Sequence, residues 1–265
     1  MSPKPPLAIA LLLAASASAC ATVTSSPPSP LYLGRAHAHN DYARARPLHD
    51  ALERGFGSIE VDVVLMDGEI FVAHELAEVR RSNTLAHLYL EPLRALAGSN
   101  GGSVYGVSDE SLQLLIDVKG SAEETYRALD EQLGAYDELL TRWTKDGVHR
   151  GPVTVVLSGN RAFDLVLADS VRYVTLDGRI DEERSSFSAE AMPLVSIDWA
   201  TLEGSPSARL AAARAWIDLV HEENRRVRFW GTPDRGPVWS SLIALGADHI
   251  GADDVALLER ILRAQ

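Results

Sequence analysis

Cysteine is almost absent from this chain, which holds a single one, Cys20, among 265 residues. One cysteine cannot form an internal disulfide, so the fold has no covalent cross-link to rely on. The alternative source of stability is a hydrophobic core. With 46% hydrophobic residues, a chain of this length can bury roughly 70–75% of the surface that its unfolded form exposes. We therefore expect a globular protein built around one large core.

Basic residues are also scarce: 25 Lys and Arg face 37 Asp and Glu, which gives a net charge of −12. Proteins that bind nucleic acid through its phosphates need clustered Lys and Arg, so this balance argues against a nucleic-acid partner. It also means that an anionic substrate needs a locally positive site, for example a bound metal ion.

Long hydrophobic runs are missing as well. The longest, residues 7–19 (LAIALLLAASASA), is short for a bilayer span. It follows Lys4 and ends in small residues, a pattern typical of an export signal. Cys20 stands directly after it, as in a bacterial lipobox, although Ala17 occupies the position where Leu is usual.

We therefore expect residues 1–20 to be a signal peptide of the lipoprotein type and residues 21–30, rich in Ser, Thr and Pro, to be a flexible tether. The protein would then be an exported lipoprotein of the bacterial cell envelope, held to the membrane by its N-terminal lipid. The alternative is cleavage by an ordinary signal peptidase near Ala19 or Ala21, which would release a secreted protein.

From residue 31 onward, apolar strand-like segments alternate with amphipathic helical ones. Eight principal strands are expected, and they begin near Leu31, Ser58, Leu112, Val153, Val171, Pro193, Arg226 and His249. This alternation is typical of a parallel sheet covered by helices. Eight units in about 250 residues predict an α/β protein with a single (β/α)8 TIM-type barrel, residues 31–265. A doubly wound open sheet is the alternative, but no glycine-rich dinucleotide or phosphate loop follows the first strand.

Several local features refine this prediction. Residues 67–74 begin with an Asp-Gly turn and continue as a short strand that extends the second one. Residues 121–143 have the pattern of one long amphipathic helix with acids in its first turn.

Polar residues gather where the predicted strands end, which is the rim that carries the chemistry of β/α barrels. Glu60 and Asp62 are two residues apart and so point to the same side of one strand. Asp117 lies on the next strand. Three carboxylates this close would repel one another, and their pKa values would rise, unless a cation lay between them. An all-oxygen set favours one Mg²⁺ or Ca²⁺ ion over zinc.

Two histidines flank these acids in the sequence, His39 before them and His74 after. Imidazole titrates near neutral pH, so the pair suits general acid and general base. Lys119, two residues after Asp117, provides a partner for an anion. A hard metal ion, a lysine and two histidines together favour phosphoryl transfer. His37, two residues before His39, is the alternative catalytic residue. Asn40 either binds substrate or closes a turn.

The order H…E-x-D…H…D-x-K resembles the phosphatidylinositol-phospholipase-C-like phosphodiesterase superfamily. Its nearer members are the glycerophosphodiester phosphodiesterases, the sphingomyelinase-D-like enzymes and the "HxHNDY" group related to altered inheritance of mitochondria protein 6. The resemblance spans nearly the whole chain after the tether. It rests on AHAHNDY (36–42), IEVDVVLMDGEIFVAHE (59–75), LLIDVKG (114–120), RVRFWGTPD (226–234) and LGADHIGADD (245–254).

The resemblance implies a TIM-type barrel in which Glu60, Asp62 and Asp117 bind Mg²⁺ or Ca²⁺ and His39 and His74 act as acid and base. It further implies that Lys119 contacts the phosphate and that Trp230 lines the substrate pocket. In these families a substrate oxygen often attacks its own phosphorus and forms a cyclic phosphate.

Two departures bear on the substrate. The H-R-G start of glycerophosphodiesterases is replaced by His39-Asn40-Asp41, and the third ligand is Asp117 where those enzymes usually have Glu. The second feature is closer to the sphingomyelinase-D pattern.

We thus expect a monomeric, metal-dependent phosphodiesterase that cleaves a phospholipid head group or a glycerophosphodiester. One alternative is a non-catalytic cell-surface barrel that binds a phosphorylated ligand. Another is a metal-dependent hydrolase of a different bond, such as an amidohydrolase, in which His37 and His39 would be ligands of a transition metal.

Overall fold

The computed structural model describes residues 1–2, 32–106 and 110–265. The predicted signal peptide (beyond its first two residues), the Cys20 anchor and the tether lie outside the described residues. Among the helices that the structure does describe, none has the length and apolar character needed to cross a membrane.

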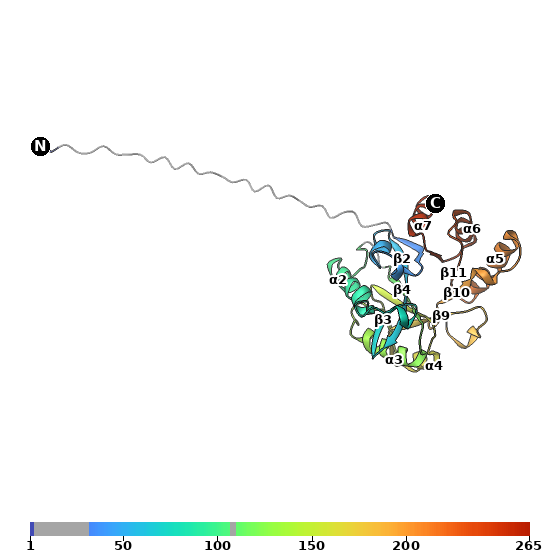
Figure 1. Cartoon of the computed structure of the whole chain (residues 1–265), viewed down its shortest axis with the longest axis horizontal. Coiled ribbons are helices and arrows are strands. Elements are labelled where there is room, and N and C mark those ends of the chain that lie inside the picture. The colour runs from blue at the N-terminus through green and yellow to red at the C-terminus, as the bar shows by residue number, and fades with distance from the viewer. Residues whose placement is uncertain (3–31, 107–109) are drawn as a thin grey trace.

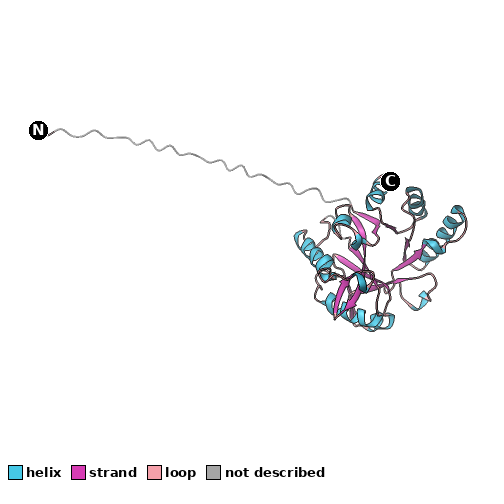
Figure 2. Ribbon diagram, viewed as in Figure 1, coloured by secondary structure: helices cyan, strands magenta, loops and turns pink. Residues whose placement is uncertain are grey.

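Eight parallel strands form a closed barrel (Figure 2), because β1 pairs with β2 on one side and with β12 on the other. This confirms the predicted TIM-type barrel, and the open-sheet alternative is wrong. The barrel strands, in their order around it, are β1 (Leu33–Ala38), β2 (Phe56–Met66), β4 (Leu112–Val118), β7 (Val153–Gly159), β9 (Val174–Gly178), β10 (Leu194–Asp198), β11 (Arg226–Trp230) and β12 (His249–Ala252).

Helices surround the barrel on its outer face (Figure 1). The α-helices are α1 (His49–Leu52), α2 (Glu91–Ser99), α3 (Ala122–Gly134), α4 (Phe163–Ala168), α5 (Pro206–Glu222), α6 (Gly236–Leu245) and α7 (Val255–Arg263). Short helical turns are η1 (Asp41–Ala43), η2 (Leu76–Glu78), η3 (Ala86–Leu90), η4 (Arg184–Ser186) and η5 (Trp199–Thr201). The core lies between the strands and this layer, because alternate apolar strand residues such as Val61, Leu114 and Val155 are fully buried.

The sequence fixes several helix ends through local chemistry. The Ser205 side chain accepts a hydrogen bond from Ala208 N and caps α5, whose first residue is Pro206. The carboxylate of Asp254 caps α7 in the same way by accepting from Leu257 N. Gly246 ends α6 at φ 102°, a conformation that glycine adopts at little cost.

β2 runs past the barrel rim and folds back as a hairpin with β3 (Glu69–Val72), as the Asp-Gly turn predicts. Asp67 and Gly68 both have positive φ, 53° and 81°, which is the geometry of a tight hairpin turn. The hairpin places His74, two residues after β3, above the barrel mouth beside Asp62.

Two expected elements differ from the prediction. The helix expected over 121–143 ends at Gly134, and Trp143 lies instead in β5 (Arg142–Thr144). β5 pairs with β6 (Gly147–His149) and with β8 (Val171–Arg172) in a small antiparallel sheet. The segment from Val171 is therefore divided: its first two residues join that sheet, and the barrel strand β9 begins only at Val174.

Candidate active site

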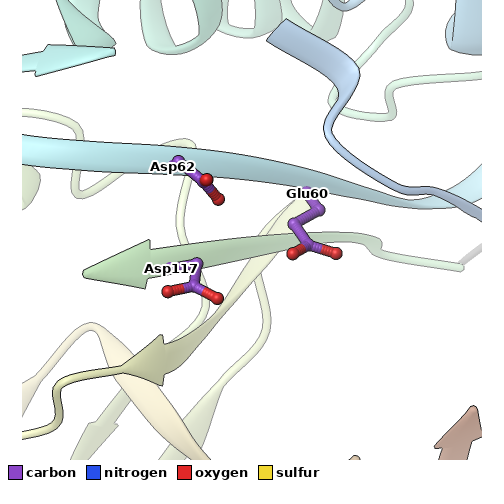
Figure 3. A group of neighbouring side chains, drawn as sticks. All are labelled: Glu60, Asp62 and Asp117. Carbon is purple, nitrogen blue, oxygen red and sulfur yellow. The ribbon is translucent and has the colours of Figure 1, made fainter. Parts of the chain in front are cut away.

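Three carboxylates converge at the carboxyl end of β2 and β4 (Figure 3). Asp62 and Asp117 are direct partners in the register of these parallel strands. Glu60 precedes Asp62 by two residues and therefore projects into the same side of the barrel. One oxygen of each of the three residues lies within 4.8 Å of the others. The structure thus brings together the three acids that the sequence pointed to.

Asp62 is fully buried, and its two oxygens have different environments. Oδ2 accepts hydrogen bonds from Tyr42 Oη at 2.8 Å and from His74 Nδ1 at 2.7 Å, and it lies 3.2 Å from Lys119 Nζ. Oδ1 is buried without a hydrogen-bond partner. A buried carboxylate oxygen left unpaired costs free energy, and a cation at this point would remove that cost.

Lys119 lies between Asp62 and Asp117, with its Nζ 3.2 Å from an oxygen of each. Burial works against the charged ammonium, but the two carboxylates outweigh it and raise the pKa of Lys119. Burial also raises the pKa of Asp117, and the neighbouring Glu60 and Asp62 raise it further, against the opposing effect of Lys119. One ammonium therefore does not neutralise this cluster.

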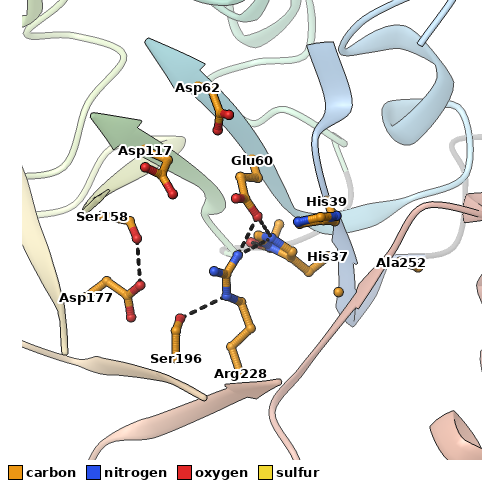
Figure 4. Close-up of polar contacts among 12 residues, drawn as sticks. His37, His39, Glu60, Asp62, Asp117, Ser158, Asp177, Ser196, Arg228 and Ala252 are labelled. Atoms are coloured by element: carbon orange, nitrogen blue, oxygen red, sulfur yellow. Dashed lines mark hydrogen bonds and ion pairs between the residues drawn. The ribbon is translucent and has the colours of Figure 1, made fainter. Parts of the chain in front are cut away.

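Glu60 has a second cation on the inner side of the barrel (Figure 4). Arg228, which comes from β11 across the barrel and is 2% exposed, donates from Nη1 to Glu60 Oε2 at 2.5 Å. Its Nε donates to Ser196 Oγ at 2.9 Å. Burial favours the protonated form of Glu60, but Arg228 and His37 outweigh it and hold the pKa of this carboxyl well below its usual range. Glu60 is thus held as a carboxylate with Oε1 free of these contacts.

His37 belongs to this inner network and not to the rim. It is fully buried, with Nε2 2.8 Å from Glu60 Oε2 and Nδ1 2.7 Å from Ser58 Oγ. Burial, together with the charge of Arg228, lowers its pKa to about 4. A neutral, enclosed imidazole of this kind fits a role in positioning Glu60 better than an exchange of protons with substrate.

His39 lies beyond the end of β1, at the rim, and its side chain is 22% exposed. Its Nδ1 is 2.9 Å from Asp253 Oδ1, at the end of β12. His74 has the same arrangement, with Nδ1 on Asp62 Oδ2 and a more exposed ring. In both residues Nδ1 is hydrogen-bonded to a carboxylate. This bond fixes the ring and leaves Nε2 as the nitrogen available for proton transfer.

The two other residues expected to contact substrate also lie at this rim. Trp230 is half-buried at the end of β11, where it pairs with Asp198 of β10. Asn40 follows β1 in a left-handed conformation with φ 45° and begins the turn η1. Asp41, next to it, is structural: its Oδ2 accepts from Leu48 N and from Tyr89 Oη.

Gly159, the last residue of β7, lies against the cluster without contributing a side chain. Its φ is 66°, and a Cβ atom at this position would overlap the carboxylate of Asp117. Only glycine therefore leaves Asp117 room to keep its place beside Asp62.

A second polar group occupies the same rim on β7 and β9. Asp177 Oδ2 accepts from Ser158 Oγ at 2.9 Å and from Arg179 Nη1 at 2.5 Å. Arg179 also donates to Ser158 Oγ at 2.9 Å. Asp177 therefore has its own fixed cation and no second carboxylate among these partners.

The donor set of Glu60, Asp62 and Asp117 fits a hard divalent cation. All three residues are carboxylates, two of them (Asp62 and Asp117) have a buried oxygen without a hydrogen-bond partner, and two ion-paired protein cations, Lys119 and Arg228, offset three negative charges. It is the one group of three or more potential metal ligands found across residues 1–2, 32–106 and 110–265, and it contains no histidine. A transition-metal site built on His37 and His39 gains no support from this geometry.

Three residues of this site were not identified from the sequence. Tyr42 donates to Asp62, Arg228 pairs with Glu60, and Asp253 holds His39. A signal existed for two of them: Tyr42 belongs to the HNDY stretch, and Arg228 is a charge inside an otherwise apolar strand. Asp253 precedes Asp254, the residue that caps α7, and no local pattern distinguishes the roles of the two acids.

Comparisons with known proteins agree with this architecture. Two crystal structures described as glycerophosphodiester phosphodiesterases resemble the chain in fold. The one from Parabacteroides distasonis has a TM-score of 0.57 at 15% identity and covers 87% of this chain and 98% of its own. The one from Agrobacterium tumefaciens has a TM-score of 0.51 at 14% identity, covering 88% of this chain and 100% of its own.

The sequence itself is similar to fungal proteins named altered inheritance of mitochondria protein 6. The protein of Eremothecium gossypii is 31% identical over 268 residues, which cover 84% of this chain and 68% of that protein. The homologue of Arthroderma benhamiae is 30% identical over 254 residues, 83% of this chain and 81% of that one. The profile of the AIM6-like phosphodiesterase domain matches residues 31–177. This confirms the resemblance seen in the motifs, and the chain belongs to the AIM6-like phosphodiesterase family.

Proposed function

We propose that this protein is a metal-dependent phosphodiesterase that cleaves a phospholipid head group or a glycerophosphodiester with His39 and His74 as general acid and base. The observation that carries the proposal is the double role of Asp62. One of its oxygens holds Nδ1 of His74, and the other is buried and unpaired within the group of three carboxylates. The side chain of Asp62 therefore connects the proposed acid–base residue His74 to the proposed cation site.

The charges of the cluster suit a singly charged substrate. Three carboxylates with Lys119 and Arg228 leave one net negative charge. A divalent ion held by Glu60, Asp62 and Asp117 reverses this to one net positive charge, the complement of a phosphodiester. Such an ion, Mg²⁺ or Ca²⁺, would supply charge stabilisation at the phosphoryl oxygens. Lys119, beside it, would bind an equatorial oxygen of the same phosphate.

The proton transfers fall to the two imidazoles. One Nε2 takes the proton of the attacking oxygen, and the other delivers a proton to the leaving oxygen. In each ring the carboxylate on Nδ1 stabilises the imidazolium that forms. Asn40 and Trp230, at the same rim, would contact the group attached to the phosphate. The attacking oxygen is either water or a hydroxyl of the substrate, and the second case gives a cyclic phosphate.

The decisive experiment is an assay of the purified protein on a panel of phosphodiesters by phosphorus NMR, with Mg²⁺ or Ca²⁺ and then with EDTA. This method detects both the substrate that is consumed and any cyclic product. We expect turnover that EDTA abolishes and that falls by about 10²–10⁴-fold in His74→Gln and in His39→Gln. His49→Gln, an exposed histidine of α1, is the matched control and should retain full activity.

Unchanged turnover in both His39→Gln and His74→Gln would refute the acid–base assignment. Metal-dependent ligand binding without any product would instead favour the non-catalytic barrel. Elemental analysis that finds zinc in place of Mg²⁺ or Ca²⁺ would favour the amidohydrolase-type alternative. The export signal and the lipid anchor at Cys20 stay predictions.

A further inference from the structure

A groove of about 520 Å³ lies between α5 and α6, which are neighbours on the outside of the barrel (Figure 1). Two of its lining residues lie just past strand ends: Trp199 directly follows β10, and Pro233 comes three residues after β11. The groove therefore opens on the carboxyl side of the barrel, the side that carries the acid cluster. Its volume falls within the range of about 300–1,000 Å³ that is typical of small-molecule sites.

The walls of the groove are apolar. Six of the residues that line it have aliphatic or aromatic side chains: Trp199, Pro206, Leu210, Pro233, Pro237 and Val238. Trp199, one of these residues, is 7% exposed and packs edge-on against Phe229 of the barrel core. Four of the six are prolines or a tryptophan, which lose little conformational entropy on binding a ligand. These walls therefore suit a hydrocarbon chain.

Two cations interrupt this apolar lining. Arg209 of α5 and Arg235, which precedes α6, both line the groove, and neither guanidinium has a hydrogen bond or ion pair with any residue that the structure describes. No acidic residue lines the groove, although acids outnumber bases in the chain by 37 to 25. Guanidinium groups are weakly hydrated and bind carboxylate or phosphate oxygens in pairs. The charge of the groove is thus complementary to an anion.

We propose that this groove binds a single-chain anionic amphiphile, with the alkyl chain against Trp199 and the anionic group between Arg209 and Arg235. A bare anion would leave the apolar walls unused, and a neutral chain would leave two cations unpaired. If the proposed function holds, the phosphodiester to be cleaved lies at the acid cluster, and the amphiphile in the groove is a neighbouring lipid of the surface that carries the substrate. The groove then assigns the substrate to the lipids rather than to the water-soluble glycerophosphodiesters. That extension rests on the proposed function, whereas the binding of an amphiphile does not.

The test is isothermal titration calorimetry of the purified protein in EDTA with decyl phosphate below its critical micelle concentration. Working without metal separates the groove from the acid cluster, so binding is measured whether or not the protein hydrolyses anything. We expect decyl phosphate and decanoate to bind. The double variant Arg209→Gln/Arg235→Gln should bind them with an affinity that is lower by about tenfold or more. Arg260→Gln is the matched control, because Arg260 of α7 is equally without a side-chain partner among the described residues and is exposed.

Three results would overturn the proposal. Equal binding of inorganic phosphate would mean a simple anion site, and equal binding of decyl maltoside would mean an apolar groove in which the arginines play no part. Dimerisation of the protein that the same double variant abolishes would assign the groove to a second copy of this chain.

A kinetic comparison then tests the link to hydrolysis. The double variant should raise KM for a lysophospholipid and leave KM for a glycerophosphodiester unchanged. Amphiphile binding with no hydrolysis of any diester would refute the proposed function and leave the groove proposal standing. Hydrolysis of both substrates with identical KM in wild type and variant would refute the lipid assignment alone.

Discussion

Asp62 and Asp177 are both fully buried at the carboxyl ends of barrel strands, and each bonds through Oδ2 while Oδ1 has no hydrogen-bond partner (Figure 4). Their surroundings differ. Asp62 faces Asp117 in register and shares the site with Glu60, whereas Asp177 has Arg179 and Ser158 as its partners. A free buried oxygen by itself therefore does not make a cation site. What distinguishes β2 and β4 is the excess of carboxylates over cations.

The largest effect that follows from this comparison concerns metal affinity. Asp62→Asn should weaken Mg²⁺ or Ca²⁺ binding by about 100-fold, since it removes one anionic ligand from a set of three. Asp177→Asn should leave that affinity within about twofold of wild type. It should instead destabilise the fold by about 1–3 kcal/mol, because Arg179 loses its buried charged partner. Calorimetric titration with the metal and urea unfolding measure the two quantities. Equal losses of affinity in both variants would mean that the two groups form one site.

The pH dependence of metal binding is the next sharpest test. Burial and the neighbouring acids raise the pKa of Asp117, and the metal competes with the proton for this carboxylate. Affinity should therefore be full above that raised pKa and fall by about tenfold per pH unit below it. The decline should begin at a higher pH than the ordinary pKa of aspartate, about 3.9, would allow. Titrations between pH 7.5 and pH 4.5 measure this, with Asp177→Asn as a control that should follow wild type. A constant affinity down to pH 4.5 would contradict the assignment of Asp117 as a ligand.

The smallest effect is on the stability of the metal-free protein. A raised pKa means that the charged form of Asp117 is less favourable in the folded protein than in the unfolded chain. This cost is present above the folded pKa and disappears as the pH falls through it. Asp117→Asn removes it, so at pH 7 in EDTA the variant should be more stable than wild type. Urea unfolding with and without Mg²⁺ measures this, and added metal should stabilise wild type only. A variant less stable than wild type in EDTA would show that Lys119 already compensates the cluster.

The convergence of the three carboxylates could be predicted from the sequence because strand geometry has a period of two. Glu60 and Asp62 had to share a face, and Asp117 and Lys119 had to do the same on their own strand. Alternating apolar strands and helices gave the eight-stranded barrel for similar reasons. The precise match of Asp62 to Asp117 depends on the register of β2 and β4, which no local pattern encodes.

Local sequence patterns could not predict the contacts that side chains make across the barrel. Arg228 lies 168 residues from Glu60 and meets it only because the sheet closes. The expected helix over 121–143 failed for a related reason. Its amphipathic pattern continues past Gly134, but pairing of Trp143 with Arg172 and Val148 in the small sheet outweighs helix propensity there. Tertiary pairing determined the outcome in both cases.

Gly159 has no side chain, and the position of Asp117 depends on that. This position supplies no side chain to the site, yet any larger residue would displace the carboxylate of Asp117 on the adjoining strand. A search for inactivating changes confined to charged residues and histidines would pass over it. In an otherwise intact member of this family, the loss of that one hydrogen-only side chain would be enough to separate the carboxylates of the proposed cation site.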